Sequence, residues 1–122
     1  NIPYGDPTAE NGKWMPGPGY ELFKTMKEKI GDKPVIAEDL GFLTDSVVKL
    51  IEDTGYPGMK ILQFAFDSDL NNPFLPKNYV RNCVCYTGTH DNDTVNGWLS
   101  TAPQNEIDFA KQYCNIADTD DF

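Results

Sequence analysis

Two kinds of apolar pattern alternate along this chain, and their order limits the folds that it can adopt. Apolar residues at helical spacing precede a helix-ending glycine at Gly31 and again at Gly55. Thr44 is a suitable N-cap for the second helix, and Pro103 is of a residue type that often begins one. The patterns predict three helices, over residues 22–30, 45–54 and 103–114.

Short apolar runs between these helices predict strands. They are "KPVIAEDLG", "MKILQFAF" and "NCVCYTG", which begin at Lys33, Met59 and Asn82. Strands that alternate with helices usually pair in parallel, so the expected fold class is α/β, either an open layer or a barrel. In both architectures functional residues gather beyond the carboxyl ends of the strands. The opening residues 1–19, rich in Pro and Gly, are expected to form an irregular loop.

Charge restricts the possible partners. The chain carries 10 Lys and Arg against 19 Asp and Glu, a formal net charge of -9. This sign disfavours nucleic acid and anionic membranes, so a neutral or cationic partner is expected. No apolar run is long enough to span a bilayer, and no signal-peptide pattern begins the chain. Cys83, Cys85 and Cys114 lack metal-binding spacing and are expected to be reduced core thiols, which favours a cytoplasmic location.

Polar residues follow two of the predicted strands. Glu38 and Asp39 end the first strand, and the only histidine, His90, lies just past the third with Asp91 and Asn92. If the strands are parallel, both clusters should face one another across the same edge of the sheet. Carboxylates that meet in a cleft suggest acid/base catalysis on a neutral substrate.

Several longer blocks of sequence carry a family resemblance. The blocks are "GKWMPGPGYELF", "PVIAEDLG", "GYPGMKILQFAF", "NPFLPKNY" and "YTGTHDNDT". In this order and at these intervals they resemble the 4-alpha-glucanotransferases known as amylomaltases or disproportionating enzymes, glycoside hydrolase family 77. The resemblance covers nearly the whole chain.

The resemblance implies a (β/α)8 TIM barrel of parallel strands alternating with helices. It also implies transfer of a segment of a 1,4-alpha-D-glucan to a new 4-position in glucose or another glucan, with retained anomeric configuration. The expected partners are malto-oligosaccharides or glucans derived from starch or glycogen, and neither a cofactor nor a metal is implied. A plastid location would apply if the source is a plant.

Family motifs also imply roles for single residues. Glu38 in "AEDLG" matches the general acid/base, and Asp91 in "THDN" matches the aspartate that stabilises the transition state. His90 matches a histidine that hydrogen-bonds the sugar. Further expected substrate contacts are Asp39, Asn92 and Trp98.

One part of the family pattern is missing from this sequence. A retaining enzyme needs a carboxylate nucleophile opposite its general acid, and the "R-I-D-H-F-R-G" type of segment that carries it in the family does not occur here. A barrel of this kind also takes about 250 residues. Residues 1–122 are therefore expected to be a C-terminal part of one catalytic barrel, with the nucleophile segment upstream and absent. Unpaired strand edges would let such a fragment self-associate.

Other interpretations of the same residues remain open. "DNDTV" from Asp91 resembles the nucleophile motif of haloacid-dehalogenase phosphatases, although that motif should directly follow a hydrophobic strand and polar "TGTH" intervenes. A non-catalytic glucan-binding fragment is a second alternative. Acids at a strand end often cap a helix or pair with a surface cation, and a lone histidine is often a turn residue. Trp98 is of a type that more often packs than binds sugar.

Overall fold

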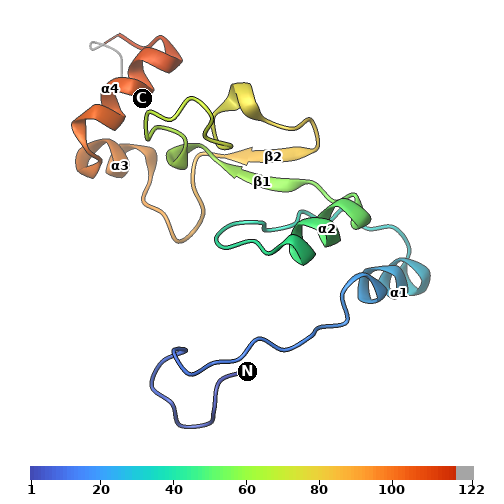
Figure 1. The fold of residues 1–122 in the computed structure, drawn as a ribbon. Coiled ribbons are helices and arrows are strands. Elements are labelled where there is room, and N and C mark those ends of the chain that lie inside the picture. Colours follow the sequence, from blue (N-terminus) through green and yellow to red (C-terminus); the bar gives the residue numbers. More distant parts are fainter. Residues whose placement is uncertain (118–122) are drawn as a thin grey trace.

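The computed structural model describes residues 1–117, and it lays their elements out in sequence order from one end of the molecule to the other (Figure 1). Two helices lie on the N-terminal side of a small central sheet, and two helices lie beyond it. The helices are α1 (Tyr20–Ile30), α2 (Asp45–Thr54), α3 (Val95–Thr101) and α4 (Gln104–Cys114). The strands are β1 (Gly58–Ile61) and β2 (Cys83–Tyr86), and the 3-10 turns are η1 (Leu62–Phe64) and η2 (Pro76–Asn78).

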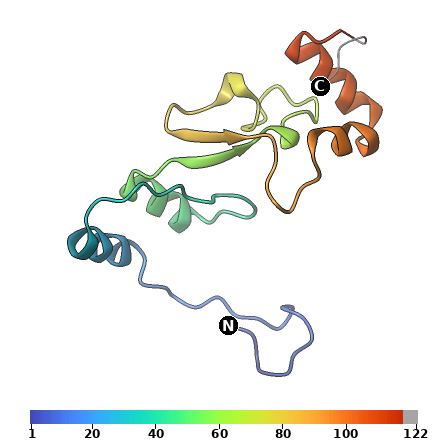
Figure 2. The ribbon, with the colours of Figure 1, turned by 180° about the vertical axis from the view of Figure 1, so that it is seen from behind.

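The first 19 residues are irregular, as predicted, and run away from the rest of the molecule (Figure 2). Asn1 and Lys13 close the start of this segment: the Asn1 amino group donates to the Lys13 carbonyl at 2.7 Å, and the Lys13 N–H donates to the Asn1 carbonyl at 2.8 Å. Tyr4 and Trp14 are fully exposed on it. The segment therefore adds almost nothing to the core.

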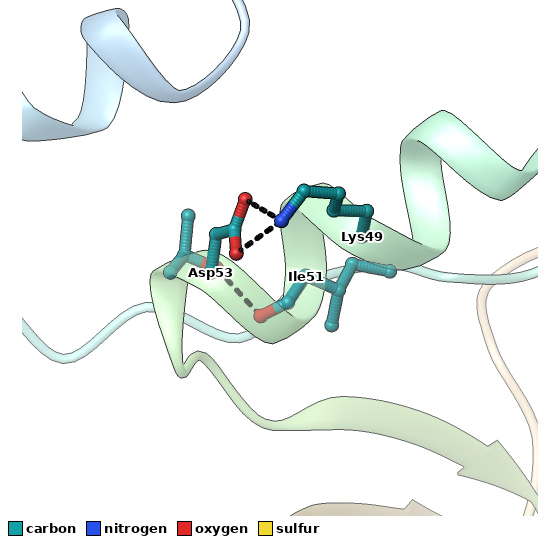
Figure 3. Close-up of polar contacts among 4 residues, drawn as sticks. Lys49, Ile51 and Asp53 are labelled. Carbon is teal, nitrogen blue, oxygen red and sulfur yellow. Dashed lines mark hydrogen bonds and ion pairs between the residues drawn. The ribbon is translucent and has the colours of Figure 1, made fainter.

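Helices α1 and α2 begin and end close to where the sequence predicts. Gly31 follows α1 with φ 79°, and Gly55 follows α2 in the left-handed region, where it donates to the carbonyls of Ile51 and Glu52. On the exposed face of α2, Lys49 Nζ lies 2.8 Å from Oδ1 of Asp53 (Figure 3). Thr44 occupies the N-cap position of α2, but its side chain makes no capping bond there.

The sheet consists of β1 and β2 paired in parallel, with Gly58 opposite Cys83 and Ile61 opposite Tyr86. This confirms the α/β class and the parallel pairing. The full barrel is not seen, because within residues 1–117 only these two strands pair. The crossover between them contains η1, a long loop and η2.

The predicted strand in "KPVIAEDLG" is not a regular strand. Ala37 donates its N–H to the Pro57 carbonyl at 2.8 Å, as in a parallel ladder. The next ladder bond would use the Met59 N–H, but that group donates to Oδ1 of Asp39 at 2.7 Å. A side chain thus takes the place of a backbone acceptor, and the ladder stops after one bond. The apolar run also predicts a buried strand, but Ile36 within it is 46% exposed.

The core lies on the far side of the sheet from α1 and α2, between η1, the following loop and α4. Its buried members are Ala65, Phe66, Leu75 and Ala110, and Trp98 and Tyr113 pack against it. Asn72 is the buried polar centre of the loop that follows η1: its side chain donates to the Phe64 carbonyl and accepts from the Phe74 N–H, both at 2.8 Å.

Two further predictions need correction. Helix α3 was not predicted from the sequence. Thr94 caps this helix, because its side chain accepts a hydrogen bond from the Gly97 N–H at 3.1 Å. The cysteines are free thiols, yet Cys85 and Cys114 are exposed and Cys83 is half-buried, so they are not core residues here. No helix in the described range is both long and apolar enough to cross a membrane.

Candidate functional site

The segment between β2 and α3, residues 87–94, carries the histidine and acids that the sequence singles out. Its shape comes from hydrogen bonds that its own side chains make. Oδ1 of Asn92 accepts from both the backbone N–H and the hydroxyl of Thr89, at 2.8 and 2.9 Å. Thr89 Oγ1 in turn accepts from the Asp91 N–H at 3.2 Å. We call residues 87–94 the HD loop.

The end of the HD loop is held by the start of α3. Oδ1 of Asp93 accepts from the Thr94 N–H at 2.7 Å, and Thr94 caps the helix. Gly97 permits this arrangement, because a Cβ at that position would overlap the Asp93 carboxylate. Asp93 is therefore engaged in local structure.

The side chains of His90 and Asp91, in the middle of the HD loop, project into solvent. Their side chains are 87% and 81% exposed, and His90 Nε2 lies 3.2 Å from Oδ1 of Asp91. A carboxylate accepts hydrogen bonds and an imidazole can donate or accept one, so together they offer complementary partners for the hydroxyl groups of a ligand.

Gln63, in η1, was not singled out from the sequence. Its backbone N–H donates to the Thr87 carbonyl at 3.3 Å, and its side-chain Nε2 donates to the Asp93 carbonyl at 2.8 Å. One residue thus contacts both ends of the HD loop. The available signal was an isolated polar residue within the apolar run "MKILQFAF".

Glu38 and Asp39 have different environments. Glu38 is exposed, whereas Asp39 is partly buried and its carboxylate is engaged by the Met59 N–H. Asp39 also lies so close to Gly58 that a Cβ there would overlap its carboxylate. Asp39 therefore ties the segment that carries Glu38 to β1, and Glu38 is left free to act on another molecule.

The remaining predicted site residues are partly engaged by the protein itself. Asn92 shapes the HD loop, and the Trp98 ring packs 5.7 Å from the Phe66 ring against the core. An open hollow of about 460 Å³ lies beside the HD loop, with Gln63, Thr87 and Trp98 in its lining. Trp98 thus contacts the core and also borders this hollow.

The phosphatase interpretation of Asp91 conflicts with the local geometry. Strand β2 ends at Tyr86, and four residues of the HD loop separate this end from Asp91. The motif requires its aspartate to follow the strand directly.

Comparison with known proteins identifies relatives over the same residues. The model of glycoside hydrolase family 77, described as 4-alpha-glucanotransferase, matches residues 1–121. A 4-alpha-glucanotransferase of Clostridium butyricum is 51% identical over 123 residues, which cover 100% of this chain and 25% of that protein. One from Thermus thermophilus is 51% identical over 114 residues, covering 92% of this chain and 23% of that protein. The chain thus spans about a quarter of the length of these relatives.

A solved structure supports the same relationship. An amylomaltase from Streptococcus agalactiae, in complex with acarbose, superposes with a TM-score of 0.90 and 41% sequence identity, covering 98% of this chain and 24% of that one. The match extends over nearly every element described above. By sequence and by structure, the chain belongs to the 4-alpha-glucanotransferase family.

Proposed function

We propose that this chain supplies the acid/base half of the active site of a 4-alpha-glucanotransferase. The observation that carries the proposal is that Glu38 and the His90–Asp91 pair are exposed, while the residues beside them are held in local hydrogen bonds. Such an arrangement leaves three polar side chains available to a ligand on a scaffold that fixes their backbone.

In the proposed reaction Glu38 protonates the oxygen of the glycosidic bond as it breaks. A carboxylate nucleophile takes the glucan segment, and ionised Glu38 then removes a proton from the 4-hydroxyl of the acceptor. The two carboxylates of a retaining enzyme stand about 5 to 5.5 Å apart. The nucleophile would come from a part of the protein outside this chain.

Asp91 and His90 have a different proposed task. Positive charge develops on the sugar ring in the transition state, and a nearby carboxylate stabilises it. Asp91 would supply that charge and His90 a hydrogen bond to a ring hydroxyl. Substrate contacts by Asp39, Asn92 and Trp98 stay predictions. The hydrogen bonds and ring contact described for these residues are made to other residues of the protein.

Malto-oligosaccharides and related alpha-glucans are the proposed substrates. The amylomaltase of Streptococcus agalactiae binds acarbose, an alpha-glucan analogue, which supports this class. The cytoplasm is the proposed location, or a plastid for a plant source. A Solanum tuberosum relative, 50% identical over 105 residues, is named chloroplastic/amyloplastic; the match covers 86% of this chain and 18% of that protein.

We further propose that residues 1–122 form the C-terminal part of a (β/α)8 barrel domain. The parallel pair of β1 and β2 supports this, as does the segment with Ala37 and Asp39. Its contacts advance in step, Ala37 with Pro57 and Asp39 with Met59, so this segment runs in the same direction as β1. Three successive segments in one direction fit a barrel wall.

A hybrid enzyme tests the proposal. This chain replaces the matching segment of the Clostridium butyricum relative, and the purified hybrid is incubated with maltotriose. Glucose and longer maltodextrins are expected in amounts that grow with hybrid concentration. A hybrid that melts like the unmodified enzyme but produces neither would contradict the proposed function.

A further inference from the structure

We propose that Gln63 is a positioning residue that sets the placement of Asp91 relative to Glu38. The inference rests on the proposed function of these two residues and adds a residue to which no role has been given above. Gln63 would not touch the substrate's reacting atoms. It would act through the HD loop.

Gln63 holds the HD loop at both of its ends. Its backbone N–H donates to the Thr87 carbonyl at the start of the loop, and its side chain donates to the Asp93 carbonyl at the end. The bonds inside the loop, from Thr89 to Asn92, determine its internal shape only. They do not connect the loop to η1, which directly follows β1, whereas Gln63 does.

The segment that carries Glu38 is attached to β1, the strand that leads directly into η1. Ala37 bonds to Pro57 just before β1, and Asp39 bonds to Met59 within it. Gln63 lies two residues past the end of β1. Both proposed catalytic residues are therefore attached to residues 57–63. The segment that carries Glu38 bonds to its start, and the loop that carries Asp91 bonds to its end.

Gly88 lies against the Gln63 amide. A Cβ added at Gly88 would lie 3.0 Å from Gln63 Nε2 and 3.2 Å from the Asn92 Cβ. A side chain at position 88 would therefore require the Gln63 amide and the turn that Asn92 forms to shift by a few tenths of an ångström.

The experiment uses the hybrid enzyme and the substitution Gln63→Leu, which keeps the approximate size of the side chain but removes the N–H donor. We expect kcat/KM to fall about tenfold to a hundredfold on maltotriose and equally on a glucosyl fluoride, since a misplaced Asp91 affects both steps. The matched control is Gln104→Leu, which removes an exposed hydrogen bond to Asp108 on α4, and its activity should be unchanged.

A double-mutant cycle separates positioning from general stability. If Gln63 acts through Asp91, then Gln63→Leu should have little effect once Asp91→Asn is present, within about twofold. A residue with a merely structural role would reduce activity by the same factor in both backgrounds. That result would overturn the inference, as would full activity of Gln63→Leu on both substrates.

A second variant tests the inference if the Gln63→Leu protein does not fold. Gly88→Ala leaves the Gln63 side chain chemically intact but crowds its amide, and it should produce the same equal losses on the two substrates. Full activity of Gly88→Ala would then overturn the inference. The two proposals can fail separately. If Asp91→Asn retains its activity, the proposed function is contradicted. If Asp91→Asn loses activity but the Gln63 and Gly88 variants do not, only the inference about Gln63 is contradicted.

Discussion

At the scale of single residues, hydrogen bonds separate the polar side chains that are engaged in structure from those to which we assign a catalytic role as a proposal. Asp39 and Asn92 satisfy backbone groups nearby, so replacing them would leave donors unpaired. Glu38, His90 and Asp91 are exposed and make no such bond to the backbone among the contacts described above. The expected effects of substitution therefore differ: loss of fold for the first group and loss of chemistry for the second.

The first prediction concerns proton transfer by Glu38. In the hybrid enzyme, Glu38→Gln should lower maltotriose turnover about a hundredfold to ten-thousandfold, because a sugar hydroxyl is a poor leaving group. A glucosyl fluoride needs little protonation and should lose much less activity. Added azide needs no general base, so it should restore turnover and form a glycosyl azide of retained configuration. Both reactions can be followed by chromatography of the products.

The matched control for this change is Glu28→Gln, an exposed glutamate on α1. It should have no effect on either substrate. Equal losses on maltotriose and fluoride in Glu38→Gln, without rescue by azide, would remove Glu38 from the acid/base role.

The second prediction concerns electrostatic stabilisation by Asp91. Asp91→Asn should reduce activity on both substrates by similar factors, because charge on the sugar ring develops in both steps. Neither a better leaving group nor azide replaces a missing carboxylate. Steady-state rates on maltotriose and glucosyl fluoride test this, and selective survival of the fluoride reaction would assign Asp91 to proton transfer instead.

At the scale of elements, asparagine side chains organise the crossover between β1 and β2. Asn72 lies buried between the carbonyl of Phe64 and the N–H of Phe74, and Asn78 donates to the carbonyls of Leu70 and Asn72. These bonds stabilise an irregular loop whose backbone groups have no helix or sheet partners. The loop brings Phe74 and Leu75 to the core side of η1.

The third prediction tests this loop. Asn72→Ala leaves one buried carbonyl and one N–H without their partner, which should cost about 2 to 4 kcal/mol of unfolding free energy. Asn71→Ala is the matched control, because the neighbouring side chain is exposed and should change stability by less than about 0.5 kcal/mol. Denaturant unfolding of the hybrid enzyme measures both. Equal stabilities of the two variants would contradict the structural role of Asn72.

At the scale of the whole molecule, the exposed surface is large for the chain's mass. Its accessible area is 9280 Å², whereas a compact monomer of this mass exposes about 6,600 Å². Large apolar side chains, Trp14 and Phe42 among them, are almost completely exposed. The large accessible area and the exposed apolar side chains agree with the finding that the chain covers only a quarter of the length of its relatives.

The fourth prediction follows from this surface. The isolated chain should associate, because exposed apolar side chains and the outer edge of β2 in a two-stranded sheet favour contacts with other copies. Sedimentation velocity over a concentration series should show mass rising with concentration, while the hybrid enzyme should not show this rise. The isolated chain should also leave maltotriose unchanged, since it has no match to the family nucleophile.

Two outcomes would contradict the fourth prediction. A concentration-independent monomer would show that the exposed apolar residues do not drive association. Disproportionation of maltotriose in proportion to the purified chain, with host enzymes excluded, would mean that a nucleophile is present after all.

Features that depend on near neighbours, or on long matched blocks, could be predicted from the sequence alone. Helix ends at Gly31 and Gly55 followed from local patterns, because capping and apolar spacing involve residues only a few positions apart. The parallel pairing of β1 and β2 was expected from the alternation of predicted strands with helices along the chain. The family followed from blocks spread over nearly the whole chain, which the comparisons confirm.

The sequence did not show which polar residues are engaged in hydrogen bonds, because this depends on packing in three dimensions. The bond from Met59 to Asp39 joins residues 20 positions apart and interrupts an expected strand, and that from Gln63 to Asp93 joins residues 30 apart. No local pattern specifies such pairs, since each depends on how separate segments pack in space. Glu38 and Asp39 are adjacent acids in the sequence, and packing against β1 alone makes one structural and leaves the other available for chemistry.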